Sequence, residues 1–346
     1  MQNIQYIALY IFLIALCFVG AKIRNDKQEN CISIQANVNS LRGVFAIFII
    51  YTHCTLAIND LPLILIPLRK VSTFGVGFFF VVSGFGLAYS FGTKQDYLKG
   101  FFRKRVSKIV VFSLVSRIVS ELIEIIMLGK KFSLKSIFVF NWYIYSLIIL
   151  YILFFAVYKV VERRDIRVIA IWASVIFVTL VFLYLNINIF DFGRSYFISQ
   201  WAFPFGITIY ECHDEIDKLM EKYKIQIFAA MAVLLGFSFI WALKSMEYSI
   251  SDLVSHNLML IPFYYFVMRT CKYVTFDNVL LRGLKTISFE IYLYHRVVMV
   301  YFKNVLPTID IWFFVLVTLV SIVISFVMNK FDNIVGIGIN KVFRVR

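Results

Sequence analysis

Residues 312–328 read WFFVLVTLVSIVISFVM, a run in which no side chain is charged. A helix that crosses the hydrocarbon core of a bilayer needs about 20 mostly apolar residues. Comparable stretches recur near 4–22, 40–58, 74–92, 106–127, 137–158, 167–187, 196–211, 226–243, 254–270, 284–303 and 309–329. The sequence therefore predicts an all-α fold, a polytopic membrane helix bundle of about ten or eleven transmembrane helices. The stretch near 196–211 is the weakest, because it is short and contains Pro204 and Gly206.

The composition of the chain agrees with a membrane protein and excludes an ordinary soluble one. Hydrophobic residues make up 61% of it and charged residues 16%, against about 45–50% and about 25% in soluble domains. The net charge of +15 comes from Lys and Arg between the apolar stretches, where cytoplasmic loops carry them. We expect these loops to contact membrane lipids and expect no nucleic-acid partner.

The Lys and Arg residues are distributed unequally between alternate connections. One set of connections, within 22–27, 94–108, 159–167, 218–224, 269–285 and 330–346, holds 24 of them. The other set, within 69–70, 130–135 and at 194, 244 and 303, holds 8. Because positive charge marks cytoplasmic loops, the first set is predicted to be cytoplasmic, with the N-terminus outside and the C-terminus inside.

The chain is expected to form one membrane unit without a soluble domain. Residues 1–36 are interpreted as an extra N-terminal transmembrane helix with a cytoplasmic connection, residues 37–330 as the core, and residues 331–346 as a basic cytoplasmic tail. The first stretch lacks the basic start of a signal peptide, which favours a retained helix.

Ionisable residues within spans are costly and indicate function. Arg42 and His53 are eleven residues apart, which is about 16 Å along one helix face. A neutral imidazole can take a proton from a hydroxyl, and a guanidinium can bind a phosphate through two hydrogen bonds. Arg117 and Glu121 have the spacing of a pair on one helix face, and Glu290, His295 and Arg296 fall in a later span.

Two further segments lie between these residues. Residues 74–86 read FGVGFFFVVSGFG, and their small side chains favour close helix packing. Residues 101–108 read FFRKRVSK, a cation cluster predicted at the cytoplasmic surface. The cluster is explained either by topology and lipid contact or as a dock for an anionic substrate such as coenzyme A.

Together these blocks resemble acyltransferase family 3, the bacterial membrane acyltransferases that O-acylate surface polysaccharides and related glycans. The resemblance rests on NSLRG (39–43) with His53, GVGFFFVVSG (75–84), the FFRKR run (101–105) and ISFEIYLYH (287–295). These blocks extend over residues 39–300. Taken singly, an Arg followed by ten residues and a His is a weak pattern, but four blocks in this order are specific.

The resemblance implies an enzyme, an acyltransferase that transfers groups other than aminoacyl groups. It would take an acyl group, most commonly acetyl, from cytoplasmic acyl-CoA to a hydroxyl of an exported or cell-surface glycan. The implied location is the bacterial cytoplasmic membrane, and the implied roles are O-acetylation and polysaccharide biosynthesis of the cell envelope. Acyl-CoA is a donor substrate, with no permanently bound cofactor.

The resemblance also implies residue roles. The implied catalytic residues are His53 and Arg42, the residues that bind acyl-CoA are Arg103, Arg105 and Lys108, the further substrate contacts are His295, Tyr292 and Trp142, and the structural glycine block contains Gly75, Ser83 and Gly84. For His295, a second acid–base role and a packing role with Tyr292 are equally favoured.

The chain departs from the family pattern at three positions. Lys108 replaces an Arg, and Gly77 and Leu147 stand where many members have acidic residues. We interpret the last of these changes as variation within a subgroup.

Other interpretations remain open. A transporter or flippase of a lipid-linked sugar would also have many spans and basic inner loops, but would typically show a repeat across two halves, which is not evident here. His213 beside Glu211, Asp214 and Glu215 is better explained by a solvated loop than by a metal site, and no metal is expected. The sequence does not indicate the acyl group, the acceptor or the oligomeric state.

Overall fold

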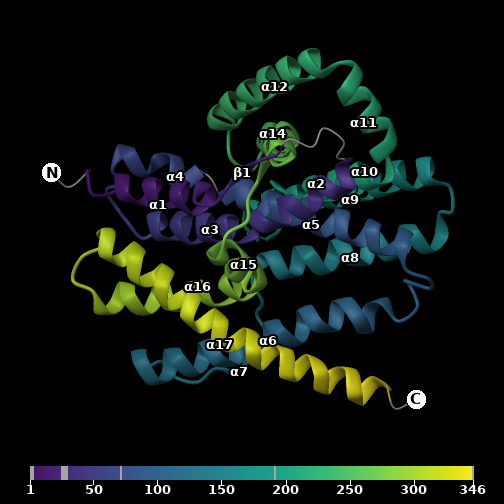
Figure 1. Ribbon diagram of the computed structural model, residues 1–346. Helices are drawn as coiled ribbons and strands as arrows, with labels where there is room; N and C mark the ends of the chain where they lie inside the picture. Colours follow the sequence, from purple (N-terminus) through teal and green to yellow (C-terminus); the bar gives the residue numbers. More distant parts are fainter. Residues whose placement is uncertain (1–3, 25–29, 71, 191, 345–346) are drawn as a thin grey trace.

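The computed structural model describes residues 4–24, 30–70, 72–190 and 192–344. In this part of the chain the regular structure is almost entirely helical (Figure 1). The helices are α1 (Ile7–Phe18), α2 (Cys31–Val38), α3 (Arg42–Leu56), α4 (Ile66–Lys70), α5 (Ser72–Thr93), α6 (Ser107–Leu128), α7 (Leu134–Ile137), α8 (Trp142–Val160), α9 (Arg164–Asn188), α10 (Ala202–Glu211), α11 (His213–Lys222), α12 (Lys224–Lys244), α13 (Ile250–Leu258), α14 (Leu260–Tyr273), α15 (Val279–Thr286), α16 (Ser288–Val305) and α17 (Ile311–Arg344). The predicted all-α bundle is therefore confirmed.

Six helical segments of the described chain are long and apolar enough to cross a membrane, and they contain α3, α5, α8, α9, α12 and α17. The other predicted stretches also form helices, namely α1, α6, α10, α13 with α14, and α16. These helices are short, broken or carry several charges inside the span. The polytopic architecture is confirmed, and the total of ten or eleven spans stays a prediction.

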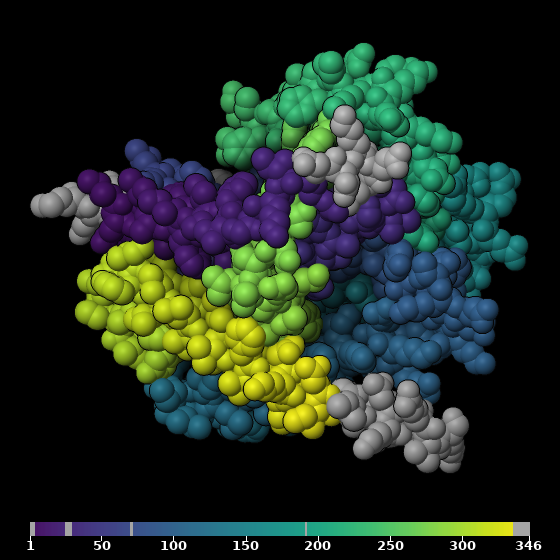
Figure 2. Space-filling model, viewed as in Figure 1, coloured from purple at the N-terminus to yellow at the C-terminus, as the bar shows by residue number. Residues whose placement is uncertain are grey.

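The helices divide into central and peripheral ones. Most residues of α3 are buried, whereas α12 lies over one side of the molecule and exposes large apolar side chains. Figure 2 shows α12 as a separate ridge, on which Val233 is 73% exposed and Phe237 60% exposed. Such a surface is stable only against lipid. At the other end of the sequence, α17 continues beyond the predicted span to Arg344, so the predicted basic tail extends this helix. Residues 345–346 lie outside the described residues.

Contacts between connections agree with the prediction that successive connections alternate between the two sides of the membrane. The short strands β1 (Lys22–Ile23) and β2 (Val274–Thr275) pair antiparallel, and both belong to the basic set of connections. Arg164 forms an ion pair with Glu215 within the same set, and its hydrogen bond lowers the pKa of the Glu215 carboxyl. Each of these contacts joins two connections that are predicted to lie on one side of the membrane.

The opposite set of connections has its own ion-pair cluster. Arg194 lies 2.5 Å from both Glu247 and Asp252. Burial raises the pKa of Asp252, but the hydrogen bond from His256 and the charge of Arg194 outweigh burial, and the pKa falls below its usual value. The cluster holds the connection after α9 against the start of α13.

Glycines bring α5 and α10 into direct backbone contact. A Cβ atom at Gly84 would collide with the carbonyl oxygen of Phe203, and one at Gly206 would collide with the carbonyl oxygen of Val81. Small residues allow this close approach in lipid, where packing rather than hydrophobicity drives association. The contact fixes the face of α5 that carries Ser83.

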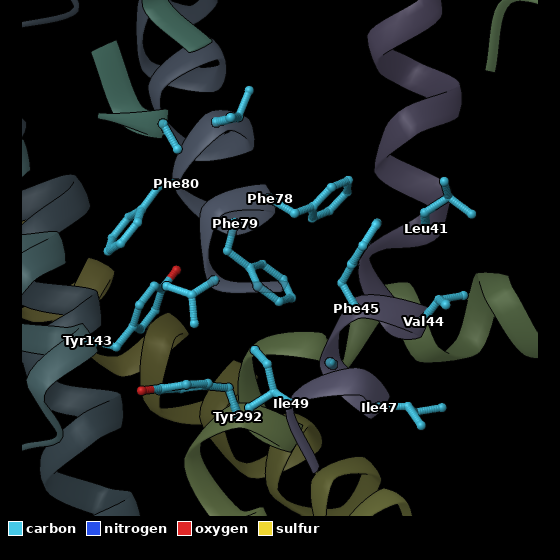
Figure 3. Close-up of a cluster of buried hydrophobic side chains, with 14 of the residues drawn as sticks. Leu41, Val44, Phe45, Ile47, Ile49, Phe78, Phe79, Phe80, Tyr143 and Tyr292 are labelled. Atoms are coloured by element: carbon cyan, nitrogen blue, oxygen red, sulfur yellow. The ribbon is translucent and has the colours of Figure 1, made fainter. Parts of the chain in front are cut away.

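Aromatic side chains fill the centre of the bundle between α3, α5, α8 and α16. The rings of Phe45 and Phe78 stack with centroids 4.0 Å apart. Figure 3 shows Phe79 and Phe80 on α5 beside Tyr143 of α8 and Tyr292 of α16. These two tyrosines lie at the boundary between the apolar core and the polar region described next.

Candidate active site

A cavity of about 240 Å³, here called the inner cavity, opens among α3, α5, α6, α8 and α16. Its lining consists of Arg42, Phe79, Ser83, Lys104, Arg105, Lys108, Ile109, Phe112, Tyr143, Leu147, Tyr151, Ser288, Phe289 and Tyr292. The cavity therefore brings together four of the residues for which the sequence suggested substrate contacts, Arg42, Arg105, Lys108 and Tyr292. Leu147, where many family members have an acid, also faces it.

The cations of the inner cavity are held in two different ways. Arg105 donates from Nε to the Tyr97 hydroxyl at 2.9 Å and from Nη2 to the Ser90 hydroxyl at 3.3 Å. These neutral acceptors orient the guanidinium without cancelling its charge. Arg42 and Lys108 form no hydrogen bond or ion pair with any described residue, and the Nε atom of Arg42 is buried without a partner. Buried Glu290 interacts electrostatically with Arg42, but no carboxylate of the described chain lines the cavity, which presents net positive charge to an anionic ligand.

A π-helical turn at Phe102–Val106 carries three of the basic residues near the cavity. Such turns widen the helix by one residue and often occur at functional sites. Lys104, Arg105 and Lys108 line the inner cavity, whereas Arg103 is exposed outside it. The predicted acyl-CoA contact of Arg103 stays a prediction, and Lys104, which was not predicted, lines the cavity.

A second cavity of about 440 Å³, here called the outer cavity, lies nearer the connection between α6 and α8. Its lining consists of Ser113, Ser116, Arg117, Ser120, Glu124, Val139, Phe140, Asn141, Ile144, Tyr292, Leu293, Arg296, Val297 and Val300. The α6 residues recur every three or four positions, so one face of that helix forms a polar wall. Hydroxyls and charges from two helices and a connection meet here.

The connection from 129 to 141 is fixed against this wall by α6. Arg117 donates two hydrogen bonds to the Ser136 carbonyl, at 3.0 and 2.9 Å. Glu121 accepts from the Ser133 amide at 3.0 Å and from the Ser136 hydroxyl. The predicted Arg117–Glu121 pair is therefore wrong, because both side chains satisfy the polar groups of the connection rather than each other.

Tyr292 is the residue common to the linings of the two cavities. The centroids of its ring and the Tyr143 ring are 4.6 Å apart. Figure 3 shows the two side chains next to each other. The Tyr292 hydroxyl is buried without a hydrogen-bond partner among the described residues. This side chain therefore lies where the two cavities are adjacent.

Two histidines meet beside Tyr292. The ring centroids of His53 on α3 and His295 on α16 are 5.0 Å apart. The ring centroids of His295 and Tyr292 are 5.8 Å apart. His295 is 1% exposed, and its Nδ1 lies 3.0 Å from the Ile291 carbonyl oxygen. Since a carbonyl only accepts, Nδ1 carries the proton, and Nε2 of the neutral ring holds a lone pair. That Nε2 has no partner among the described residues.

Comparison with known families decides the class of the protein. A family model described as an acyltransferase domain matches residues 35–330. The chain belongs to acyltransferase family 3. Comparison with curated proteins and with solved structures gave no match. The protein is a multi-pass membrane acyltransferase.

His53 and His295 are adjacent to Tyr292 but are not among the lining residues of either cavity. Three other predicted residues of the acyltransferase, Gly75, Gly84 and Trp142, also lie outside both cavities. Gly75 packs against α3, where an added Cβ would lie 3.2 Å from Ile49, and Gly84 packs against α10. Trp142 contacts Tyr143 and Tyr196 at the end of α8. Ser83, predicted within the structural glycine block, instead lines the inner cavity of the acyltransferase.

The predicted solvated loop around His213 is wrong, because Glu211 ends α10 and His213 begins α11. Polar side chains at this junction form ion pairs and hydrogen bonds. Glu211 accepts from Tyr158 at 2.7 Å, and His213 Nδ1 contacts the Tyr210 carbonyl at 2.7 Å. In the described part of the acyltransferase, no group of three His, Cys, Asp or Glu side chains is arranged to hold a metal ion.

Several residues that line the cavities were missed at the level of sequence. Tyr143 and Tyr151 flank Leu147 at four-residue spacing on α8, and Ser288, Tyr292 and Arg296 repeat the same spacing on α16. The spacing itself was a usable signal, because positions four apart share a helix face. Arg296 had been recognised only as an ionisable residue within a span.

Proposed function

We propose that this acyltransferase moves an acyl group, with acetyl as the first candidate, from acyl-CoA at the inner cavity to a glycan hydroxyl in the outer cavity. The observation that carries the proposal is the His53–His295 pair, which lies beside the one side chain common to both cavities. The family match supplies the reaction class. The proposed setting is the bacterial cytoplasmic membrane, with the C-terminus and the inner cavity on the cytoplasmic side.

The inner cavity fits part of the donor. At about 240 Å³ it is smaller than the roughly 300–1,000 Å³ of pockets that enclose a drug-sized ligand. We therefore assign the acyl group and the thiol-bearing arm to the cavity and the phosphates to its cationic residues. Arg42 and Arg105 can each bind a phosphate through two donors, and Lys108 acts as a point charge.

The reaction requires removal of a proton from the acceptor hydroxyl. In the proposal, His53 takes this proton as the oxygen attacks the thioester carbonyl. His295 orients His53 and shares the proton through its free Nε2 lone pair. The carbon–sulfur bond then breaks, and the departing thiolate of coenzyme A recovers the proton. A site that excludes water favours transfer over hydrolysis.

The test uses the purified protein in liposomes with labelled acetyl-CoA and a lipid-linked glycan extract. His53→Ala is expected to lower acyl incorporation about 100-fold or more, within the range for loss of a general base. His295→Ala should lower the rate with little change in donor affinity.

His213→Ala is the matched control, because His213 also bonds a backbone carbonyl but lies far from both cavities in a connection. Full acyl incorporation by His53→Ala would contradict the proposal. Movement of unmodified lipid-linked glycan without any need for acyl-CoA would favour the transporter instead.

A further inference from the structure

The outer cavity contains a cation that no residue in the described part of the chain pairs with. Arg296 lines it and forms no hydrogen bond or ion pair within residues 4–24, 30–70, 72–190 and 192–344. Its side chain is exposed although it lies inside a predicted span. A charged side chain in such a position is costly and normally has a partner. We propose that Arg296 binds a carboxylate or phosphate of the acceptor, so that the enzyme selects acidic glycans; this rests on the proposed function.

The charge balance of the outer cavity supports an anionic ligand. The guanidinium of Arg117 is bound by the neutral carbonyl of Ser136 and keeps its positive charge. The one carboxylate of the lining, Glu124, is paired with Lys130 at 2.5 Å. Lys130 also lies 3.6 Å from the buried carboxylate of Glu121, so three cations (Arg117, Arg296 and Lys130) face two carboxylates and one positive charge remains. Arg296 is the cation of this group that has neither a hydrogen bond nor an ion pair to a described residue, and an anion is attracted to it.

The remaining lining suits a sugar. Ser113, Ser116 and Ser120 follow one face of α6, and Asn141 faces them from the start of α8. The hydroxyl of Ser113 is buried and has no hydrogen-bond partner among the described residues. The hydroxyl of Ser116 donates to the Ser113 backbone carbonyl at 2.8 Å. Serine and asparagine side chains can both donate and accept, as recognition of sugar hydroxyls requires.

The position of Arg296 next to His295 sets how far the acidic group of the glycan would lie from the hydroxyl that is acylated. Arg296 follows His295 directly and lies one helical turn after Tyr292, a rise of about 6 Å. An anion bound by Arg296 would hold a hydroxyl on the same or the neighbouring residue of the glycan near the histidine pair. Such an acceptor contains either a uronic acid or a phosphodiester, and both present the same oxygen chemistry to a guanidinium.

The experiment measures acyl transfer in phosphatidylcholine liposomes, which contain no anionic lipid. Three acceptors are compared: a lipid-linked oligosaccharide with glucuronic acid, the same compound after reduction of its carboxyl groups, and a lipid-linked glycerol phosphate oligomer. We expect kcat/KM to be about tenfold higher or more for at least one acidic acceptor than for the neutral one, as a charge-assisted pair implies. The preferred acidic compound identifies the source of the anion.

Arg296→Gln should remove most of this preference by raising KM for the acidic acceptor, and Arg296→Lys should restore part of it. Lys303→Gln removes a positive charge from the same helix outside the cavity and should leave the preference intact. Donor binding, measured separately with acetyl-CoA, should be the same in all variants.

Equal transfer to the acidic and neutral acceptors, or an acidic preference that survives Arg296→Gln, would overturn the inference while leaving acyl transfer established. Absence of transfer to every acceptor, together with absence of acetyl-CoA binding, would instead refute the proposed function and the inference with it. Inhibition of the wild type by added phosphatidylglycerol, without any preference among the glycans, would assign Arg296 to a lipid headgroup and also overturn the inference.

Discussion

The inner and outer cavities differ in size and in the charged and polar side chains that line them. The inner cavity is smaller, and its described lining holds four cations and no carboxylate. The outer cavity is larger and combines two arginines with a glutamate and three serines. A cavity with one kind of charge suits a constant ligand such as a polyphosphate, whereas mixed polar groups suit a ligand recognised by its shape and hydroxyls. Under the proposed function, the difference predicts a general donor side and a selective acceptor side.

The strongest test of this division is Arg42→Ala. Because Arg42 forms no hydrogen bond or ion pair with a described residue and has a buried Nε, its loss should lower kcat/KM for acyl-CoA by about 100-fold, the upper range for a charged hydrogen-bonding group. The KM for the glycan should stay the same. Steady-state kinetics with each substrate varied in turn would measure both effects, and a rise in glycan KM instead would show that the cavities are not functionally separate.

A comparison of Arg105→Ala with Arg103→Ala tests which side chains of the π-helical turn contact the donor. Arg105 faces the inner cavity and Arg103 does not, so the first change should weaken acetyl-CoA binding about tenfold and the second less than about twofold, as for exposed charges. Calorimetric titration with acetyl-CoA measures both. Equal losses would indicate that the whole basic run binds the donor.

Tyr292→Ala should break the separation between the cavities. Removal of the ring would connect them and admit water to the thioester, so that hydrolysis of acyl-CoA relative to transfer should rise roughly fivefold. Release of free acid and labelled glycan can be counted in one assay. Tyr292→Phe keeps the ring and should retain the wild-type ratio; a hydrolysis ratio unchanged in Tyr292→Ala would show that another group forms the partition.

The smallest effect is expected from Glu121→Gln. This change weakens the hydrogen bonds that fix Ser133 and Ser136 and should loosen the wall of the outer cavity. We expect the glycan KM to rise about two- to threefold, in line with a loss of about 0.5–1 kcal/mol, with donor affinity unchanged. A change in donor affinity would mean that α6 couples the two sides.

Much of the fold could be predicted because a long apolar stretch is stable as a helix that faces lipid. The stretch 312–328 and the stretches like it do form helices, and Arg42, Arg105 and Lys108 do meet in one cavity. What the sequence could not provide was the local geometry of helix ends and turns. The run FFRKR, for example, does not itself indicate that Lys104 lines the cavity while Arg103 is exposed outside it.

The partners of buried polar groups were equally out of reach. Arg117 and Glu121 have ideal spacing for an intrahelical pair, but the unsatisfied backbone of a nearby connection competed for both side chains. The meeting of His53 and His295 joins α3 to a helix more than 200 residues later, and nothing local in either sequence segment specifies that contact. The stretch near 196–211 is weak by hydropathy because it contains Gly206, yet in the structure this glycine lies against the backbone of α5.

Tyr292 has a consequence beyond the chemistry of transfer. In the proposed function, its ring lies where the donor side of the enzyme meets the acceptor side. A cell that depends on a proton gradient across this membrane cannot tolerate a leak at such a point, so this boundary must stay closed while substrates enter from opposite sides. The same ring that limits hydrolysis would then also preserve the electrical seal of the bilayer.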